Sequence, residues 1–319
     1  MDHILSGRKN IGYGCMTLKK KLWRQRWLFL FCLPGFLFFL IFAYAPMFGV
    51  IIAFEDFDPA RGFFASPFVG WANFKTIFSV PAFLRALRNT LAISALKLAV
   101  VFPASIVFAL LINEITFLRF KRVIQTITYL PYFISWVIVS GLFYKMLAIE
   151  SGVVNDVLRL TGLTSTDIMF MGRPDMFYGI AVFTDLWKNL GFNAIIYLAA
   201  LAGINPELYE AATVDGAGRF RRTWHISLPG ILPTVILMLI MAAGGLMYAG
   251  FDQMWTLGNI QIRETAEILD TLILRNLKSA GIYSLGPSGA MGLFTSVCSF
   301  LLFILANGLA RAVKQESLI

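Results

Sequence analysis

The sequence predicts an all-α, polytopic membrane protein with six transmembrane helices. Of its 319 residues 58% are hydrophobic and 14% are charged, whereas a soluble globular domain has about 45–50% apolar and roughly 25% charged residues. Long apolar runs recur along the chain, and the basic residues are concentrated in alternate connections between them. This composition argues against a soluble enzyme and a disordered regulator. The 3 cysteines are too few for a disulfide framework or a cysteine metal site.

Each apolar run is long enough to cross a bilayer, which takes about 20 helical residues. The runs cover residues 27–54, 91–113, 123–147, 177–204 and 231–251, and a sixth ends at residue 310. The charged residues within them are Lys97, Lys145, Asp185 and Lys188. Pro131 and the Gly244-Gly245 pair are candidate points at which the third and fifth helices bend.

The first run resembles a secretory signal, because several basic residues precede it and Ala43-Tyr44-Ala45 follows its centre. A signal core has about 7–15 apolar residues, and this run is far longer. We therefore expect an uncleaved first helix, preceded by a short disordered tail at residues 1–18.

The basic residues predict the orientation, because Lys and Arg are enriched in cytoplasmic loops. If the N-terminus is inside, the inner segments hold 15 Lys and Arg and the outer segments hold 9. Both termini are then cytoplasmic, with tails at residues 1–26 and 311–319 around a membrane domain at residues 27–310. The net charge of +9 therefore reports topology, and we expect no nucleic-acid partner.

The inner loop at residues 203–229 carries a helix–turn–helix pattern. Asn205 followed by proline is an N-cap with proline in the first helical position. Gly216 ends this short helix, because glycine adopts a left-handed conformation at little cost. A second short helix then leads into the fifth span. We expect the first helix to lie outside the membrane with Ala211 and Ala212 exposed for a partner protein, and the alternative is a helix resting on lipid headgroups.

This loop resembles the cytoplasmic signature of binding-protein-dependent ABC importer permeases. The matching residues are Glu210-Ala211-Ala212, then Gly216, then Ile226-Ser227-Leu228-Pro229. Over residues 20–319 the chain resembles the carbohydrate permeases of the lipoprotein-transport type, through Tyr44–Val50, Gly70-Trp71, Asn73-Phe74, Asn89-Thr90-Leu91, Tyr129–Trp136, Leu186-Trp187-Lys188 and Glu316-Ser317-Leu318. Within that branch it is most similar to a membrane subunit of importers for oligosaccharides or acidic polysaccharides, such as oligogalacturonan or alginate.

The resemblance implies a type I ABC importer permease fold in a bacterial cytoplasmic (inner) membrane. The signature loop would be a coupling helix that docks on a cytosolic ATPase, with the coupling residues Glu207, Glu210, Ala211, Ala212, Asp215 and Gly216. The implied partners are two ATPase subunits, an extracytoplasmic solute-binding protein and a second permease subunit, which is either a different one, in a heterodimer, or a second copy of this chain. ATP and Mg would bind to the ATPase, and this chain would bind no cofactor.

The chain lacks the residues for ATP hydrolysis. Residues 7–12 have the glycine spacing of a P-loop, but Tyr13 stands where lysine is required. Its 2 histidines are not paired in a metal-binding motif. We therefore expect a non-catalytic subunit with no metal site.

Two groups of residues are candidates for the substrate path. On the third helix Tyr132, Trp136, Ser140 and Tyr144 recur at every fourth residue, an aromatic and polar stripe that suits stacking on sugar rings, although ordinary helix packing explains it equally. The fourth helix offers Lys188, Asn189 and Asn193. Asp185 and Lys188 lie three residues apart and are expected to pair, whereas a Lys188 that faces a cavity would favour uronate carboxylates.

The outer loops are long enough to bind a partner, and the sequence also bears on other classes of membrane protein. Residues 57–88 and 252–278 are expected to form the docking surface for the binding protein. An ion-coupled secondary transporter of small solutes is the alternative function, but such proteins usually carry several intramembrane carboxylates and here only Asp185 qualifies. A membrane-embedded enzyme would need an acid/base or metal cluster, and a purely structural protein leaves the signature loop unexplained.

Overall fold

A computed structural model describes residues 25–279 and 285–312, and these residues are almost wholly helical. Within them the β-structure consists of one isolated antiparallel bridge between Glu55 and Phe68. The chain divides into an N-terminal unit, residues 1–51, and a main unit, residues 52–319. The predicted disordered tail at residues 1–18 lies outside the described residues, and so do residues 313–319 of the predicted C-terminal tail, whose residues 311 and 312 end α15.

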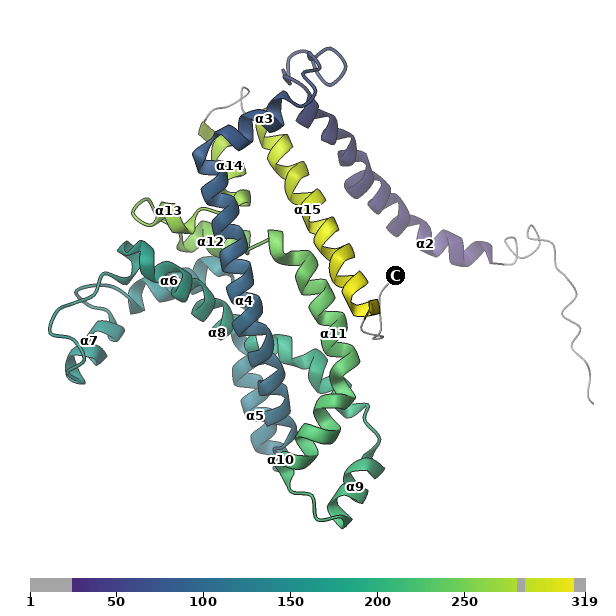
Figure 1. Cartoon of the computed structure of the whole chain (residues 1–319), viewed down its shortest axis with the longest axis vertical. Helices are drawn as coiled ribbons and strands as arrows, with labels where there is room; N and C mark the ends of the chain where they lie inside the picture. Colours follow the sequence, from purple (N-terminus) through teal and green to yellow (C-terminus); the bar gives the residue numbers. More distant parts are fainter. Residues whose placement is uncertain (1–24, 280–284, 313–319) are drawn as a thin grey trace, which may run out of the picture. The chain divides into compact units, whose positions relative to one another are not determined.

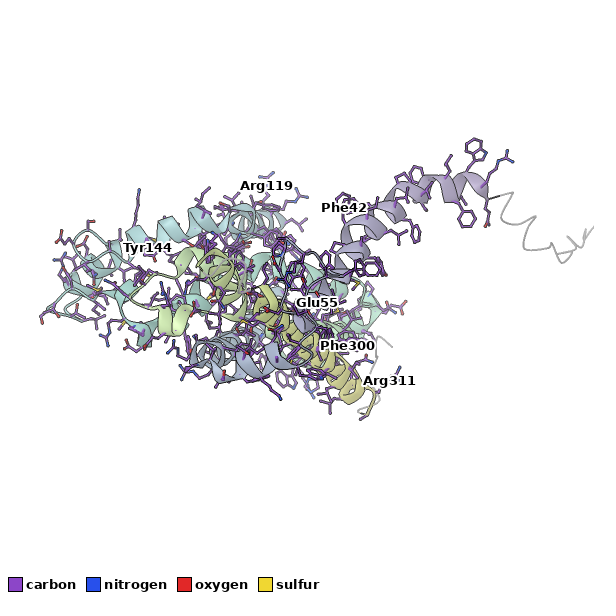
Figure 2. All side chains as sticks on the ribbon, turned by 90° about the horizontal axis from the view of Figure 1, so that it is seen from above. Phe42, Glu55, Arg119, Tyr144, Phe300 and Arg311 are labelled. Atoms are coloured by element: carbon purple, nitrogen blue, oxygen red, sulfur yellow. The ribbon has the colours of Figure 1, made fainter. Side chains whose placement is uncertain are left out.

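The first predicted span is one continuous helical stretch. It consists of α2 (Arg26–Phe39), a π-helical turn η1 (Leu40–Tyr44) and a 3₁₀ segment η2 (Ala45–Phe54). None of the residues of α2 is buried, and Phe42 of η1 is 66% exposed (Figure 2). A helix that is apolar on every side requires lipid or another protein around it.

The main unit contains the remaining elements. Its first half comprises α3 (Ala72–Ser79), α4 (Pro81–Asn113), α5 (Leu118–Tyr129), η3 (Leu130–Phe133), α6 (Trp136–Met146), α7 (Val153–Leu160), η4 (Phe170–Gly172) and α8 (Pro174–Ala202). Its second half comprises α9 (Pro206–Val214), α10 (Arg219–Arg222), η5 (Thr223–Ser227), α11 (Leu228–Gly244), η6 (Gly245–Met247), α12 (Phe251–Leu257), α13 (Arg263–Ala266), α14 (Leu269–Ser279) and α15 (Leu285–Ala312). In Figure 1, α9 and α10 lie at one end of this unit and α3 and α14 at the other, with α4 and α11 running between them.

Four described helices are long and apolar enough to span a membrane. They are Arg26–Phe54, Pro81–Asn113, Arg219–Met247 and Leu285–Ala312. The bent pair Leu118–Phe133 and Trp136–Met146 makes a fifth if it is counted as one span. The remaining predicted span is α8, whose 29 residues are long enough but whose charged and amide side chains lower its hydropathy.

The third predicted span, residues 123–147, is divided into two helices, and the break lies close to Pro131, one of the two candidate bending points. The chain leaves the helix at Ile134 and Ser135, which are extended with ψ of 136° and 150°, and the two halves meet at 103°. Pro131 lies just before this break and cannot donate a backbone hydrogen bond. Ser135 then caps α6 by accepting a hydrogen bond from the Ile138 N–H at 3.4 Å. At the second candidate point α11 ends at Gly244 and continues as the 3₁₀ turn η6, but Arg219–Met247 remains one helical stretch.

The spans of the main unit pack closely through small residues, as is usual in membranes. On α8 a Cβ atom at Gly191 would lie 2.3 Å from the Thr128 carbonyl oxygen of α5. On the opposite sides of the helices large apolar side chains remain uncovered, and Phe300 of α15 is 62% exposed (Figure 2). The exposed apolar surface fits a chain surrounded by lipid and by other subunits.

Candidate functional site

The helix α9 forms as the local sequence predicts. The Asn205 side chain accepts a hydrogen bond from the Glu207 N–H at 3.1 Å, and proline occupies the first turn. After the last helical residue, Val214, the backbone at Gly216 has φ of +75°. The predicted N-cap and the predicted glycine terminator are both confirmed.

The residues predicted for coupling lie mostly on the surface of this loop. Glu207, Glu210, Ala211, Asp215 and Gly216 are exposed. Ala212 is half-buried, so of the two alanines that were expected to be exposed only Ala211 is. The exposed side of α9 therefore presents carboxylates beside one small residue.

Three side-chain contacts join this loop to the adjoining elements. The Tyr209 hydroxyl of α9 lies 2.9 Å from the Ser227 hydroxyl at the end of η5. Arg222 of α10 donates to the Thr213 hydroxyl at 2.9 Å. Thr223 donates to Glu114, just after α4, at 3.1 Å. Because α10, η5, α11 and η6 form the continuous helical stretch Arg219–Met247, these contacts connect α9 to a candidate membrane span.

The break in the third span is stabilised by Lys188 of α8. The Lys188 ammonium donates to the carbonyl oxygens of Pro131 at 3.1 Å, Tyr132 at 2.6 Å and Ile134 at 2.6 Å. It also lies 5.6 Å from the centroid of the Trp136 ring. Lys188 is 5% exposed and its three N–H donors are all used. A Lys188 that faces a cavity is therefore excluded, and the lysine instead binds three backbone carbonyls at the break.

The expected stripe on the third helix is shortened, because the break separates Tyr132 from Trp136, Ser140 and Tyr144, which remain at every fourth position of α6. Tyr132 lies before the break and stacks on Phe192 of α8, with ring centroids 3.5 Å apart. Trp136 lies after it and packs against a buried apolar cluster. Ser140 lies 2.6 Å from the Thr256 hydroxyl, and Tyr144 donates to the Leu257 carbonyl at 2.8 Å. The hydrogen bonds of Ser140 and Tyr144 thus join α6 to α12.

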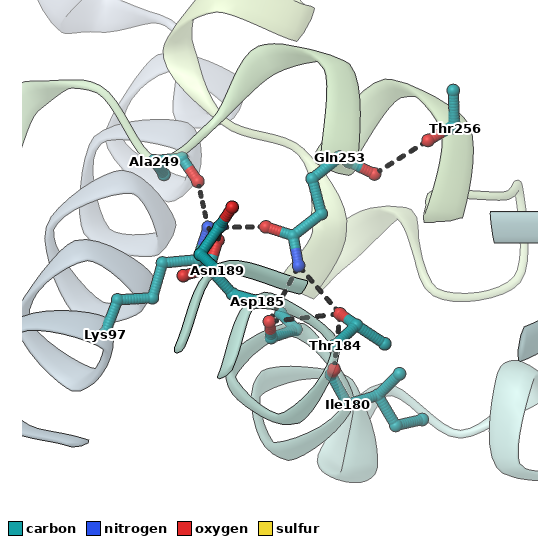
Figure 3. Close-up of polar contacts among 9 residues, drawn as sticks. Lys97, Ile180, Thr184, Asp185, Asn189, Ala249, Gln253 and Thr256 are labelled. Carbon is teal, nitrogen blue, oxygen red and sulfur yellow. Dashed lines mark hydrogen bonds and ion pairs between the residues drawn. The ribbon is translucent and has the colours of Figure 1, made fainter. Parts of the chain in front are cut away.

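The expected ion pair between Asp185 and Lys188 is also absent. Asp185 pairs with Lys97 of α4 at 3.1 Å, because the two side chains face each other across the interface between α4 and α8 (Figure 3). Lys97 also donates to the Ala249 carbonyl at 2.8 Å and to the Gln253 side-chain oxygen. Gln253 in turn donates to the Ala181 carbonyl at 2.7 Å. This network joins α4 and α8 to the segment between α11 and α12.

Asp185 is the first of a row of polar residues along one side of α8. Asn189 donates to Asp185 at 3.2 Å, and Asn193 follows one turn later with an exposed side chain. The three residues recur at every fourth position and so share one side of the helix. An exposed amide on a membrane helix is unfavourable against lipid, which places this face against a water-filled path or another subunit.

Two further polar residues of α4, Asn89 and Thr90, make hydrogen bonds to residues far along the chain. The sequence did not predict these contacts. The Asn89 amide of α4 donates to the carbonyls of Glu264 at 2.8 Å and Glu267 at 2.9 Å, and its oxygen accepts from Tyr178 at 2.7 Å. The neighbouring Thr90 hydroxyl accepts from the Leu269 N–H at 3.0 Å. Asn89 and Thr90 therefore anchor the segment around α13 to α4. In the sequence these two polar residues directly precede the apolar run at residues 91–113, which is the feature that could have drawn attention to them.

Comparison with known proteins agrees with this arrangement. Residues 101–315 match the family described as the binding-protein-dependent transport system inner membrane component. Over 295 residues the chain is 43% identical to protein LplB of Bacillus subtilis, covering 92% of each chain. It is 39% identical to the polygalacturonan/rhamnogalacturonan transport system permease protein YteP of the same organism, covering 93% of this chain and 92% of that protein.

Solved structures show the same fold. A chain of a bacterial ABC transporter involved in the import of the acidic polysaccharide alginate is 37% identical and superposes with a TM-score of 0.85, over 94% of this chain and 100% of that chain. A chain of the bacterial alginate ABC transporter in complex with an alginate pentasaccharide-bound periplasmic protein is 36% identical, with a TM-score of 0.86 over 95% of this chain and 100% of that chain. The protein therefore belongs to the family of inner membrane components of binding-protein-dependent transport systems, and is a multi-pass permease subunit of an ABC importer.

Proposed function

We propose that this chain forms half of the translocation path of an ATP-driven importer for an acidic oligosaccharide or polysaccharide. The observation that carries the proposal is α9, which exposes Glu210 and Ala211 and is joined by Tyr209 to the base of a membrane span. Such a helix suits docking in a groove of another protein, because small residues allow the close approach of a second backbone. The similarity to YteP and to the alginate transporters supports a substrate that carries uronate groups.

The energy is supplied by partner subunits in this proposal. Two cytosolic ATPases bind ATP and Mg, and closure of their dimer moves α9. Tyr209 and the continuous helix of residues Arg219–Met247 pass that movement to the span, which alternates access to a path between the permeases. This chain itself contributes no catalytic residue.

The path face of this chain is the polar side of α8, with Asn189 and Asn193 directed toward substrate. Lys188, Tyr132, Trp136, Ser140 and Tyr144 act as positioning residues, because their contacts stabilise the break in the third span and its junction with α12. A second, different permease subunit supplies the other half of the path. An external solute-binding protein delivers the substrate, and the similarity to the alginate transporter solved with its substrate-loaded periplasmic protein supports this step.

The cytoplasmic membrane holds this assembly with both termini inside in this proposal. Both tails then share a side with the α9 loop, and α13 and α14 face outward. The excess of Lys and Arg in the predicted inner segments supports this orientation.

A matched pair of glycine variants tests the coupling role. Gly216 has φ of +75°, whereas Gly218 has φ of −68°, and a Cβ at either position meets no atom within 4 Å. Gly216→Val therefore disturbs the turn after α9, while Gly218→Val leaves the backbone unstrained. We expect Gly216→Val and Glu210→Gln to abolish ATP-driven uptake of oligogalacturonate or oligoalginate into proteoliposomes, and Gly218→Val to retain it.

The readouts are uptake and substrate-stimulated ATPase activity of the importer reconstituted with its ATPase and binding protein. Thermal unfolding of each variant shows that the membrane domain remains folded. Normal uptake in Gly216→Val would overturn the coupling role. Uptake driven by an ion gradient without the ATPase would instead support the secondary-transporter alternative.

A further inference from the structure

The segment between the last two spans encloses a pocket that none of the contacts above uses. It has a volume of about 200 Å³ and is open to solvent on one side. Its polar and aromatic lining consists of Trp255, Asn259, Arg263, Glu267, Thr271 and Arg275, from α12, α13, α14 and their connections. Ligand pockets for drug-sized molecules measure about 300–1,000 Å³, so this one suits a group the size of a single sugar ring.

The charged groups of the pocket leave one positive charge in excess. Arg275 forms an ion pair with Glu267, which is 8% exposed. Arg263 is exposed, and none of the ion pairs found among the described residues includes it. Burial and the charge of Arg263 lower the pKa of Arg275. A carboxylate bound beside the two guanidinium groups would offset this repulsion and would match their planar donors.

The other polar side chains of the pocket are already committed to the fold. Asn259 donates to the Met171 carbonyl at 2.7 Å and accepts from the Gln261 N–H at 2.9 Å. The Thr271 hydroxyl donates to the Ile268 carbonyl at 2.9 Å and accepts from the Ile268 N–H at 2.9 Å. These bonds stiffen the walls of the pocket. The capacity to bind a ligand therefore rests first on Arg263 and on the aromatic ring, with Arg275 beside them in its ion pair with Glu267.

That ring, Trp255, is held in place and remains partly uncovered. It stacks on Phe251 at 5.8 Å between centroids, and the Lys278 ammonium lies 4.9 Å from its centroid. Its side chain is 36% exposed. The C–H groups of a pyranose ring pack well on an indole, so the uncovered part of Trp255 offers a surface for a sugar ring beside a positive charge for its acid group.

The pocket also lies on the side of the main unit from which, in the proposed function, the substrate arrives. The helices α12, α13 and α14 lie toward the end of the main unit opposite to α9 (Figure 1), and Asn89 anchors the backbone at Glu264 and Glu267 to α4. On the same α12, Gln253 joins the intramembrane network of Lys97 (Figure 3). The site is thus rigidly held at the outer side and is connected to the spans.

We propose that this pocket is an outer subsite that binds one carboxylated sugar unit of an incoming chain, with Arg263 and Arg275 on the carboxylate and Trp255 on the ring. The inference rests on the proposed function, because it assumes that the importer carries uronate-containing saccharides. It adds a binding site on this subunit outside the membrane path.

Direct binding to the complete importer, reconstituted in nanodiscs without the binding protein, tests the subsite. The probes are a trigalacturonate and its fully methyl-esterified form, which has nearly the same shape without the charges. We expect saturable binding of the acid, measured by titration calorimetry, and binding at least about tenfold weaker for Arg263→Gln, the size expected for one charge-assisted contact. The ester should bind weakly to both proteins. Trp255→Leu should weaken binding of both probes.

Arg173→Gln is the matched control, because Arg173 is also an exposed arginine of the predicted outer side but pairs with Asp175 outside the pocket. Each variant is checked by thermal unfolding and basal ATPase activity, so that a misfolded protein is not mistaken for one without the subsite. Equal affinity of wild type and Arg263→Gln for the acid, or no saturable binding by wild type, would overturn the subsite. Uptake by the same preparations tests the proposed function separately, since transport of acidic chains without a subsite refutes only the inference.

Discussion

The Lys97 ammonium lies 3.1 Å from a carboxylate oxygen of Asp185, and the pair joins α4 to α8 within the membrane-spanning part of the chain. Each side chain is only 15% exposed. Because Lys97 also donates to the Ala249 carbonyl, one side chain connects two spans to the segment that follows α11. An unpaired charge is far less tolerable in such a place than a neutral pair.

Replacing one member of this pair should therefore destabilise the protein strongly. We expect Lys97→Met to lower the free energy of unfolding by about 3 kcal/mol, since Asp185 is left buried without its partner. The double variant Lys97→Met with Asp185→Leu should recover most of that loss. Thermal and denaturant unfolding of the purified protein in detergent measures both. A double variant as unstable as Lys97→Met would show that the ion pair is not the cause.

The lysine at the helix break should matter through its three carbonyl contacts. Lys188→Met leaves the carbonyls of Pro131, Tyr132 and Ile134 without this donor, and we expect a loss of about 2 kcal/mol. Hydrogen exchange should rise specifically at residues 130–138. Lys145→Met is the control, because Lys145 lies on the neighbouring α6 outside these contacts and its loss should leave exchange unchanged. Equal effects of the two substitutions would contradict the stabilising role of Lys188.

The close approach of α8 to α5 predicts different results for two glycines of the same helix. A methyl group at Gly191 would meet the Thr128 carbonyl oxygen at 2.3 Å, whereas one at Gly179 meets no atom within 4 Å. Gly191→Ala should therefore cost about 2 kcal/mol through forced separation of the helices. Gly179→Ala should be neutral or slightly stabilising, because alanine favours the helix by up to about 1 kcal/mol. Melting temperatures that fall equally in both variants would refute the close contact.

The hydrogen bonds by which Asn89 anchors the segment around α13 predict different results for two variants. Asn89→Leu leaves the carbonyls of Glu264 and Glu267 without the amide donor and the Tyr178 hydroxyl without its acceptor. We expect the free energy of unfolding to fall by about 2 kcal/mol. Tyr178→Phe removes only the last of these bonds and should cost about 1 kcal/mol. Limited proteolysis within residues 259–279 should accelerate most in Asn89→Leu. The prediction fails if the two variants are cleaved at the same rate.

Features that depend on neighbours in the chain were predictable from sequence. The Asn205 cap, the proline after it and the left-handed Gly216 bound α9 as expected, because capping and turn formation involve only adjacent residues. Most of the membrane spans were predictable for the same reason, since hydropathy is a property of a continuous run. The signature loop was sufficient to indicate the family that the comparisons show.

The sequence by itself thus determined that the chain is helical, crosses a membrane several times and carries a short capped helix, α9, between two of its spans. The tertiary structure decided which polar groups meet: Asp185 pairs with Lys97 of a distant helix, and Lys188 binds the backbone of the broken third span. Local spacing favoured a pair between Asp185 and Lys188, but in a packed membrane domain each charge binds whatever partner the neighbouring helix places beside it. The requirement to satisfy every buried charge and carbonyl is met across helices, and only the packing of those helices specifies the partners.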